Sequence, residues 1–230
     1  MATAATVRPK VDVFPHANYI VSAEAEEVEG APPKPPLKDQ APAAKLHRMK
    51  QRYDQQGVIS SVECVMLVNL HSHPHVLLLQ HKKTKVYRLP GGKCRVGEDH
   101  VECLHRKLNS KLRAGETPQS VTCHASPLIG DAGGGQSSEM LFRVGELLSE
   151  WVRPNFDPLM YPYRPPHVTK EKEVRAIYLV QLAPEGVLTV RRDFECVAIP
   201  LFELHDNTAK YGSVVAGIPQ SISRLHINLC

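Results

Sequence analysis

The sequence lacks the features that would place it in a membrane or in a disulfide-linked class. No apolar run approaches the roughly 18 residues that a membrane-spanning helix needs. The first residues lack the cationic start and apolar core of a secretory signal peptide. The 6 cysteines include no C-x-x-C pair, so we expect reduced thiols rather than a disulfide framework or a zinc set. These absences predict a soluble intracellular protein with no membrane partner.

The sequence also has little net charge. It carries 28 Lys and Arg against 24 Asp and Glu, which gives a formal charge of +4 and a pI near 8.7. This mild basic bias is compatible with an acidic partner but does not by itself indicate nucleic-acid binding. The 230 residues, 42% of them hydrophobic, suffice for one domain with a sizeable core.

The first forty residues differ in composition from the rest. They are rich in Ala, Pro, Val and Glu, and prolines at positions 32, 33, 35 and 36 exclude a helix or a central strand there. We expect residues 1–40 to form an extended or flexible arm, in which only residues 13–21 (VFPHANYIV) are apolar enough to dock on the protein. The domain itself is expected to span residues 41–230.

The first half of the domain has clear secondary-structure signals. Leu46, Met49 and Tyr53 recur at helical spacing ahead of Gly57. Two apolar runs, residues 61–70 and 75–81, read as buried strands joined by a short turn, and residues 86–90 as a third strand. A helix is expected over residues 98–111, because an acidic start precedes an apolar stripe.

The second half alternates irregular and apolar stretches. Residues 113–140, which include GDAGGGQSSE, predict a long flexible loop, and the Pro-rich, aromatic residues 151–173 an ordered but irregular segment. Residues 174–182, 187–192 and 195–204 are strand-like, and residues 211–229 suggest a closing helix interrupted near Pro219. The order of strands and helices predicts an α/β layered fold with a mixed sheet.

One loop and the helix after it resemble a known catalytic motif. Gly92, Glu98 and Arg106 have the spacing of the front half of the Nudix box, G-x5-E-x7-R-E-U-x-E-E-x-G-U. This resemblance to Nudix hydrolases implies a Nudix-type α/β/α sandwich with a mixed β-sheet, here with an N-terminal arm and a C-terminal helical extension. The glutamates of that box share one helix face and hold divalent cations against a diphosphate. At their positions, and at the final glycine, stand Lys107, Ser110, Lys111 and Arg113.

The replaced residues reverse the charge of the face that would bind the metal. Lys107 and Lys111 are cations and Ser110 is neutral where the box has three acids. Repulsion between Mg²⁺ and an ammonium group about 4 Å away is on the order of 2 kcal/mol even in bulk water, and a hard cation also needs oxygen ligands. We therefore expect no catalytic residue, no metal site and no cofactor. Glu98 and Arg106 are expected to form an ion pair or helix-end contact that braces the loop.

A wider resemblance covers roughly residues 12–230, with an insertion around 115–140. Its specific blocks are LPGG followed by GED and Arg106, the W-x-RPNF and YPY segment from Trp151 to Lys170, IPLFEL before residues 206–207, and PQ-x-x-SR. These blocks resemble the family of small Nudix-domain subunits of the mRNA cleavage factor Im complex. The resemblance implies a catalytically inactive nuclear protein of pre-mRNA 3′-end processing. It also implies a homodimer that binds UGUA in single-stranded pre-mRNA and a larger subunit with an RNA-recognition motif.

The resemblance and the residues together give a set of candidate RNA-binding positions. Residues 81–95 carry six cations and no acid, which is typical of a rim that contacts phosphates, and one aromatic that can stack on a base. The resemblance implies four base-reading positions: an acid at Glu63, a basic helix residue at Lys45, an aromatic pair at Val86–Tyr87 and a Tyr-Gly pair at Tyr211–Gly212. The expected RNA-binding residues are Lys45, Glu63, Lys85, Val86, Tyr87, Arg88, Tyr211 and Gly212.

Three of the matching positions depart from the family pattern. Lys45 stands where the family usually has arginine, Val86 stands where it has an aromatic, and Leu37 stands where it has an acidic reader. A lysine cannot form the bidentate contact of an arginine, so UGUA specificity is left open. Two other functions remain as alternatives: a protein-interaction scaffold without specific RNA binding, and an active Nudix hydrolase that would use Glu98, Asp99 and Glu102.

Histidines gather around the turn between the first two predicted strands. His71, His73, His75 and His81 include alternate positions that would share one face of a strand. No cysteine or acid nearby completes a tetrahedral set. We therefore expect no metal ion to bind these histidines.

Overall fold

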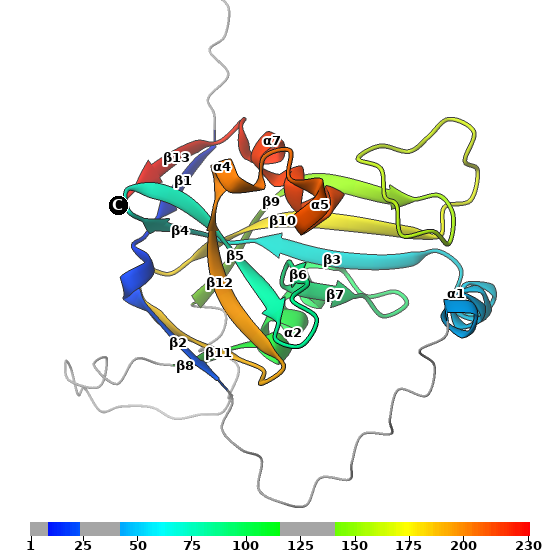
Figure 1. Ribbon diagram of the computed structural model, residues 1–230, viewed down its shortest axis with the longest axis horizontal. Coiled ribbons are helices and arrows are strands. Elements are labelled where there is room, and N and C mark those ends of the chain that lie inside the picture. Colours follow the sequence, from blue (N-terminus) through cyan, green and yellow to red (C-terminus); the bar gives the residue numbers. More distant parts are fainter. Residues whose placement is uncertain (1–8, 24–41, 116–140) are drawn as a thin grey trace, which may run out of the picture.

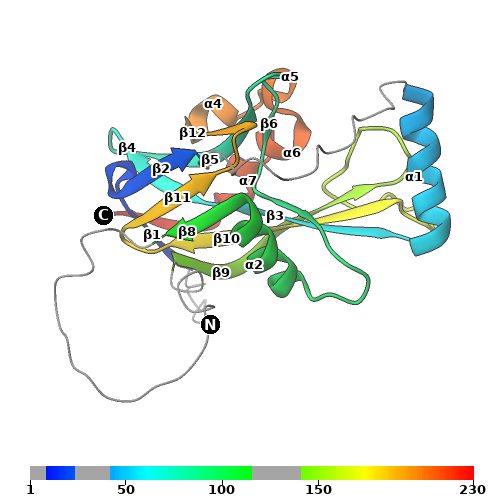
Figure 2. The same cartoon turned by 90° about the horizontal axis from the view of Figure 1, so that it is seen from below.

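The computed structural model describes residues 9–23, 42–115 and 141–230. Strands dominate it (Figures 1 and 2). In chain order they are β1 (Lys10–Val13), β2 (Tyr19–Ala23), β3 (Ile59–Val65), β4 (Leu67–Leu70), β5 (His73–His81), β6 (Tyr87–Arg88), β7 (Gly91–Lys93), β8 (Leu112–Gly115), β9 (Phe142–Arg153), β10 (Glu173–Leu182), β11 (Gly186–Val190), β12 (Phe194–Pro200) and β13 (His226–Leu229).

Two long helices and several short ones accompany the strands. The helices, with one 3-10 turn η1, are η1 (His16–Asn18), α1 (Pro42–Gln56), α2 (His100–Lys111), α4 (Leu201–Leu204), α5 (Thr208–Tyr211), α6 (Ser213–Ala216) and α7 (Ile218–Ile222). Asp99, one of the acids at the expected helix start, caps α2, since its side chain accepts a hydrogen bond from the backbone N–H of Val101. Among the described residues, no helix combines the length and the apolar character needed to cross a bilayer.

The strands form four sheets that mix parallel and antiparallel pairs. Their orders are β7-β3-β10-β9, β12-β5-β4 with β6 beside β5, β2-β11-β8, and the pair β1-β13. Strand β3 pairs in parallel with β10 and antiparallel with β7. Helix α2 lies on one side of the sheet that contains β3 and β10, and helices α4 to α7 lie on the other side, as both views show (Figures 1 and 2). The expected α/β fold with mixed sheets is therefore confirmed.

The layered arrangement follows from alternation along the central strands. On β5, Val76 and Leu78 belong to the core cluster beneath the short helices, whereas Leu77 and Leu79 belong to the cluster beneath α2. Because both faces of this strand are buried, its sequence is a continuous apolar run rather than an alternating one. Leu104 on α2 and Leu204 on α4 are both fully buried and belong to opposite clusters.

The segment expected to be a flexible arm contains ordered strands in its described part. Strand β1 pairs in parallel with β13, and β2 pairs in parallel with β11. Val11, Val13 and Tyr19 are buried, so the apolar residues here do dock, as their composition suggested. Prolines are concentrated further along, and residues 1–8 and 24–41 lie outside the described part of the chain.

Four other sequence expectations require correction. The apolar run 61–70 is not one strand: it changes sheet at Met66, and only its second half forms the hairpin with β5. Residues 201–204 are helical, because the chain turns at Pro200. Residues 211–229 form short helices and then β13 rather than one closing helix. Residues 113–115, expected in a loop, pair with β11, and residues 116–140 lie outside the described part.

Candidate nucleic-acid interface

A cavity of about 620 Å³ opens between α1, the first residues of β3 and β10, and the short helices α5 and α6. Its lining combines basic, aromatic and apolar side chains with two carboxylates. The lining residues are Arg48, Met49, Arg52, Ile59, Glu63, Tyr87, Arg88, Leu89, Lys93, Arg153, Phe156, Pro158, Met160, Lys172, Glu173, Arg175, Tyr211, Gly212, Ser213, Val214 and Val215. Seven basic side chains against two acids make this cavity electropositive.

The structure brings together five of the eight sequence-predicted RNA-binding residues. Glu63, Tyr87, Arg88, Tyr211 and Gly212 all line the cavity, although they come from three separate parts of the chain. Strand pairing places the first two parts: β6, which carries Tyr87 and Arg88, pairs with β5, and β3, which carries Glu63, pairs with β7. The third part is the end of α5, where Tyr211 lies. The acid, the aromatic and the Tyr-Gly pair of the predicted set therefore share one site.

The other three predicted residues have different places. Lys85 is exposed in the turn before β6, with a left-handed φ of 55°, and Val86 is 45% exposed beside it. Neither lines the cavity. Lys45 belongs to α1, but its side chain lies outside the described part of the structure. Arg48 and Arg52 follow Lys45 at helical spacing and do line the cavity.

Two tyrosines form the aromatic wall. The ring centroids of Tyr87 and Tyr211 are 4.8 Å apart, and the ring planes are inclined by 55°. The hydroxyl of Tyr211 donates to Glu203 at 2.5 Å, and Lys210 donates to the same carboxylate at 2.8 Å. The Lys210 Nζ also lies 5.0 Å from the centre of the Tyr211 ring. Tyr211 is buried and held in place, whereas Tyr87 is only half-buried.

A buried ion network forms another wall of the cavity. Glu173, which is 5% exposed, accepts hydrogen bonds from the Ser61 hydroxyl at 2.9 Å and from Arg175 Nη2 at 3.1 Å. Arg153 Nη2 lies 3.2 Å from the other Glu173 oxygen, and Arg175 Nη1 lies 3.2 Å from Glu63 Oε1. The network crosses from β10 to β3 and β9, and Arg175 connects both carboxylates of the cavity.

The two carboxylates of this network differ in their electrostatics. Burial raises the pKa of Glu63, and the attraction of Arg175 offsets this only in part. Burial also acts to raise the pKa of Glu173, but Arg175 and Arg153 outweigh it and the pKa is lowered. Glu173 is therefore a fixed anion that balances two arginines. Glu63 is the carboxylate whose protonation and hydrogen bonds a bound ligand could change.

Cations and aromatic rings also meet near α1 and in the segment after β9. Lys172 Nζ lies 4.0 Å above the Tyr53 ring and 5.5 Å from the Phe156 ring, and these two rings meet edge to face. Burial and then the neighbouring Arg52 lower the pKa of Lys93. This proximity of like charges favours an anionic ligand.

The sequence indicated only part of this basic lining. Of the six cations expected to form the rim, Arg88 and Lys93 reach the cavity. The other four, Lys82, Lys83, Lys85 and Arg95, are exposed but do not line it. The arginines from α1, β9 and β10 were missed. Arg153 stands in the RPNF block that carried the family resemblance, which was the one signal that could have marked it.

The replaced positions of the Nudix box lie close to this cavity. The end of the Lys107 side chain packs over Gly92, where a Cβ would lie 3.1 Å from Lys107 Cε. Lys111 is half-buried, and burial lowers its pKa while the nearby Glu63 acts in the opposite direction. A lysine therefore interacts with Glu63 from the helix face where the box has acids. The face is cationic in the fold as well as in the sequence.

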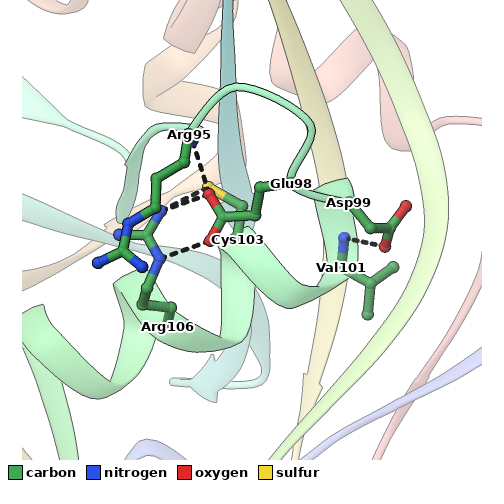
Figure 3. A network of polar contacts seen from close by, with 6 residues as sticks. All are labelled: Arg95, Glu98, Asp99, Val101, Cys103 and Arg106. Carbon is green, nitrogen blue, oxygen red and sulfur yellow. Dashed lines mark hydrogen bonds and ion pairs between the residues drawn. The ribbon is translucent and has the colours of Figure 1, made fainter.

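The predicted brace between Glu98 and Arg106 is confirmed (Figure 3). Arg106 donates to both oxygens of Glu98, at 2.5 Å from Nε and 2.6 Å from Nη2. The backbone N–H of Arg95 donates to Glu98 Oε2 at 2.7 Å. The hydrogen bonds from Arg106 and from the Arg95 backbone lower the pKa of Glu98 to about 2. Glu98 therefore fixes the loop to α2.

Comparison with known proteins gives one family model and several related chains. The NUDIX_2 model, described as a nucleotide hydrolase, matches residues 9–225. The pre-mRNA cleavage factor Im 25 kDa subunit 2 of Arabidopsis thaliana is 38% identical over 221 residues, which are 95% of this chain and 96% of that protein. Subunit 1 of the same organism is 36% identical over 95% of this chain and 86% of its own length.

A third relative comes from a second organism. The cleavage and polyadenylation specificity factor subunit 5 of Dictyostelium discoideum is 35% identical over 187 residues, which are 81% of this chain and 84% of that protein. The similarity thus spans nearly the whole fold, including the strands that precede α1.

Proposed function

Because this chain belongs to the Nudix family and, within it, to the 25 kDa subunits of pre-mRNA cleavage factor Im, we propose that it is a non-catalytic RNA-binding subunit of the pre-mRNA 3′-end processing machinery. The names of its relatives support a role in pre-mRNA 3′-end processing. The composition of the cavity supports RNA binding. On this proposal the protein works in the nucleus, where pre-mRNA is processed.

The observation that carries RNA binding is the composition of the cavity. Single-stranded RNA is recognised by stacking bases on aromatic rings, by hydrogen bonds to base edges and by neutralising phosphates. Tyr87 offers a half-buried ring, and Glu63 offers a carboxylate of raised pKa that can bond a base edge. Seven basic side chains surround them. A volume of about 620 Å³ falls within the range of about 300–1,000 Å³ of ligand pockets.

Two arginines in the wall support an oxygen-rich ligand. Within the described part of the chain, the Nε–H groups of Arg153 and Arg175 are buried and meet no acceptor. Buried donors of this kind are normally satisfied by protein, water or ligand. We propose that phosphate or base oxygens of the bound strand accept from them, which places part of the RNA against the Glu173 network.

The charge of α2 supports the absence of hydrolysis. A hydrolase of this family needs acids that hold a divalent cation near the diphosphate, but Lys107 and Lys111 stand there, and Lys111 interacts with Glu63. Two of the three candidates for an unorthodox hydrolase are otherwise engaged: Glu98 is bound by Arg106, and Asp99 caps the helix. Release of product from nucleoside diphosphate derivatives in the presence of Mn²⁺ would favour that alternative.

We extend the proposal to the assembly. The family resemblance implies a homodimer that recruits a larger subunit carrying an RNA-recognition motif. Light scattering on the purified chain is expected to give twice the mass of 25.6 kDa. A monomer at micromolar concentration would contradict the dimer without affecting RNA binding. If the chain captures the larger subunit but binds no RNA, the scaffold alternative replaces the proposal.

The direct test is a titration of fluorescent single-stranded RNA with the full chain. We expect binding that weakens steeply with salt, with a slope of log K against log salt of about −2 if three phosphates are contacted. A flat salt dependence would remove the basic lining from the site. UGUA-containing and scrambled RNA are compared in parallel. Equal affinities would mean that the departures at Lys45, Val86 and Leu37 have abolished base-specific recognition.

A further inference from the structure

Two cysteines and a glutamate converge where the loop after β7 meets α2. The Sγ atoms of Cys94 and Cys103 and a carboxylate oxygen of Glu98 all lie within 4.8 Å of one another. In the parts of the chain that the structure describes, these three form a group with metal-ligand geometry. Figure 3 shows Glu98 and Cys103 facing each other. The two cysteines are nine positions apart in the sequence, so their spacing does not match a C-x-x-C metal motif.

Backbone contacts fix each member of the group. The N–H of Cys94 donates to Ser60 O at 2.9 Å, which continues the pairing of β7 with β3. The N–H of Cys103 donates to Asp99 O at 2.9 Å in the first turn of α2. The N–H of Glu98 donates to Arg95 O at 3.2 Å and closes the turn between them. The site is therefore held by a strand, a turn and a helix, and Cys103 is fully buried.

The ligand types and spacing suit a thiophilic divalent cation. Zinc binds cysteine thiolates at about 2.3 Å, which places two sulfurs about 3.8 Å apart in a tetrahedral site. Ligand atoms already within 4.8 Å reach that arrangement by small side-chain rotations. Glu98 Oε2 accepts from Arg106 and from the Arg95 backbone, whereas Oε1 accepts from Arg106 Nε among the hydrogen bonds described. A lone pair of Oε1 is thus available for a metal.

Charge balance favours the same ion. Two thiolates and one carboxylate carry three negative charges, and Arg106 supplies one positive charge beside them. A divalent cation would make the group neutral, which matters because burial penalises uncompensated charge. Arg106 also contacts Cys103 Sγ with its Nη2 at 3.5 Å, so it orients both the carboxylate and one thiol.

We propose that Cys94, Cys103 and Glu98 form a zinc site, with Arg106 orienting Glu98 and with the fourth position of the ion open to solvent. The site differs from the acid positions of the Nudix box, which are residues 107, 110 and 111 here. The ion ties the loop that carries Lys93, a cavity-lining residue, to the first turn of α2. The inference is independent of the RNA-binding proposal.

Binding of the ion must displace the thiol protons. Metal binding is therefore expected to release protons and to strengthen as the pH rises.

The test uses the full chain, reduced and freed of metal, titrated with Co²⁺ as a spectroscopic probe for zinc. We expect one equivalent to produce a thiolate-to-cobalt charge-transfer band in the near ultraviolet, and Zn²⁺ to remove the band by displacement. Cys94→Ser and Cys103→Ser should each lose the band, whereas Cys230→Ser, in which the exposed thiol is removed, should keep it. Arg106→Gln should weaken Co²⁺ affinity by about 10- to 100-fold.

A thermal measurement keeps the proposal testable if a variant folds poorly. Zn²⁺ should raise the Tm of the parent and of Cys230→Ser but not that of Cys94→Ser. A missing charge-transfer band would overturn the site. A band that survives in both Cys94→Ser and Cys103→Ser would do the same, as would a disulfide that persists under reducing conditions. RNA affinity of the metal-free chain is measured alongside, so failure of RNA binding and failure of the zinc site are distinguished.

Discussion

Tyr87 and Tyr211 face each other in the cavity with ring centroids 4.8 Å apart and planes inclined by 55°. One ring comes from the short strand beside β5 and the other from the end of α5. Tyr211 is anchored by its hydroxyl on Glu203, whereas Tyr87 keeps a partly exposed face. This asymmetry makes Tyr87 the ring expected to stack on a base.

Loss of the Tyr87 ring should therefore weaken RNA binding selectively. Stacking of a base on an aromatic side chain contributes about 1–3 kcal/mol, so Tyr87→Ala should weaken affinity by about 5- to 150-fold in an anisotropy titration. Tyr87→Phe keeps the ring and serves as the matched control. Equal losses in both variants would mean that the hydroxyl, and not the ring, contacts the RNA.

The arginine that joins the two cavity carboxylates should be essential for stability. Arg175→Met leaves Glu63 and Glu173 without that partner, and breaking a buried ion pair from one side costs about 3–5 kcal/mol. The free energy of unfolding in urea measures the loss. Arg164→Met is the control, because the Arg164 side chain is 62% exposed in its ion pair with Glu171, where about 0–1 kcal/mol is expected. Similar losses in both variants would contradict the role of burial.

Gly91 should tolerate no side chain. Its φ is +143°, and a Cβ there would lie 2.2 Å from the carbonyl oxygen of Val62, which belongs to the backbone of the adjacent strand. We expect Gly91→Ala to lower the free energy of unfolding by about 2–4 kcal/mol. Gly97 also has a positive φ, of +78°, but open space around the Cβ position. Gly97→Ala should lose only about 1 kcal/mol from backbone strain. If the two losses are alike, close strand approach is not the cause.

The brace at the start of α2 should respond to acid. The pKa of Glu98 is lowered from 4.5 to about 2 in the folded protein. A lowered pKa contributes stability that is present above pH 4.5 and is lost as the pH falls toward 2. The urea midpoint of the parent, freed of metal, should therefore decrease across this window. The Glu98→Gln variant lacks the titrating group, so its midpoint should decrease less over the same range. Parallel curves for parent and variant would show that other groups dominate.

Local signals were enough to predict helix α2, its acidic start and the Glu98–Arg106 brace. All three depend on residues within one loop and one helix. The hairpin of β4 and β5 was predictable for the same reason, except that the run before it changes sheet at Met66. An apolar run buried on both faces has no polar residue to mark such a change.

Non-local pairings were not predictable. Strand β9 was missed because several of its side chains are exposed, so its apolar pattern is weak, and because it follows the poorly patterned residues before 141. Strands β1 and β2 are short and pair with partners more than 160 positions away. The cavity was predicted in part: the family resemblance located Glu63, Tyr87 and Tyr211. The arginines of β9 and β10 and the cysteine pair required the strand register to be known.

The parallel pairing of β1 with β13 has a consequence for synthesis of the protein. Lys10 aligns with His226, so the first strand emerges from the ribosome long before its partner exists. At about 5–20 residues per second, that interval is on the order of 10–40 s. During this time Val11 and Val13 have no partner strand from β13, and the nascent chain is exposed to premature association. Chaperone dependence during translation is therefore expected to concentrate on this first strand.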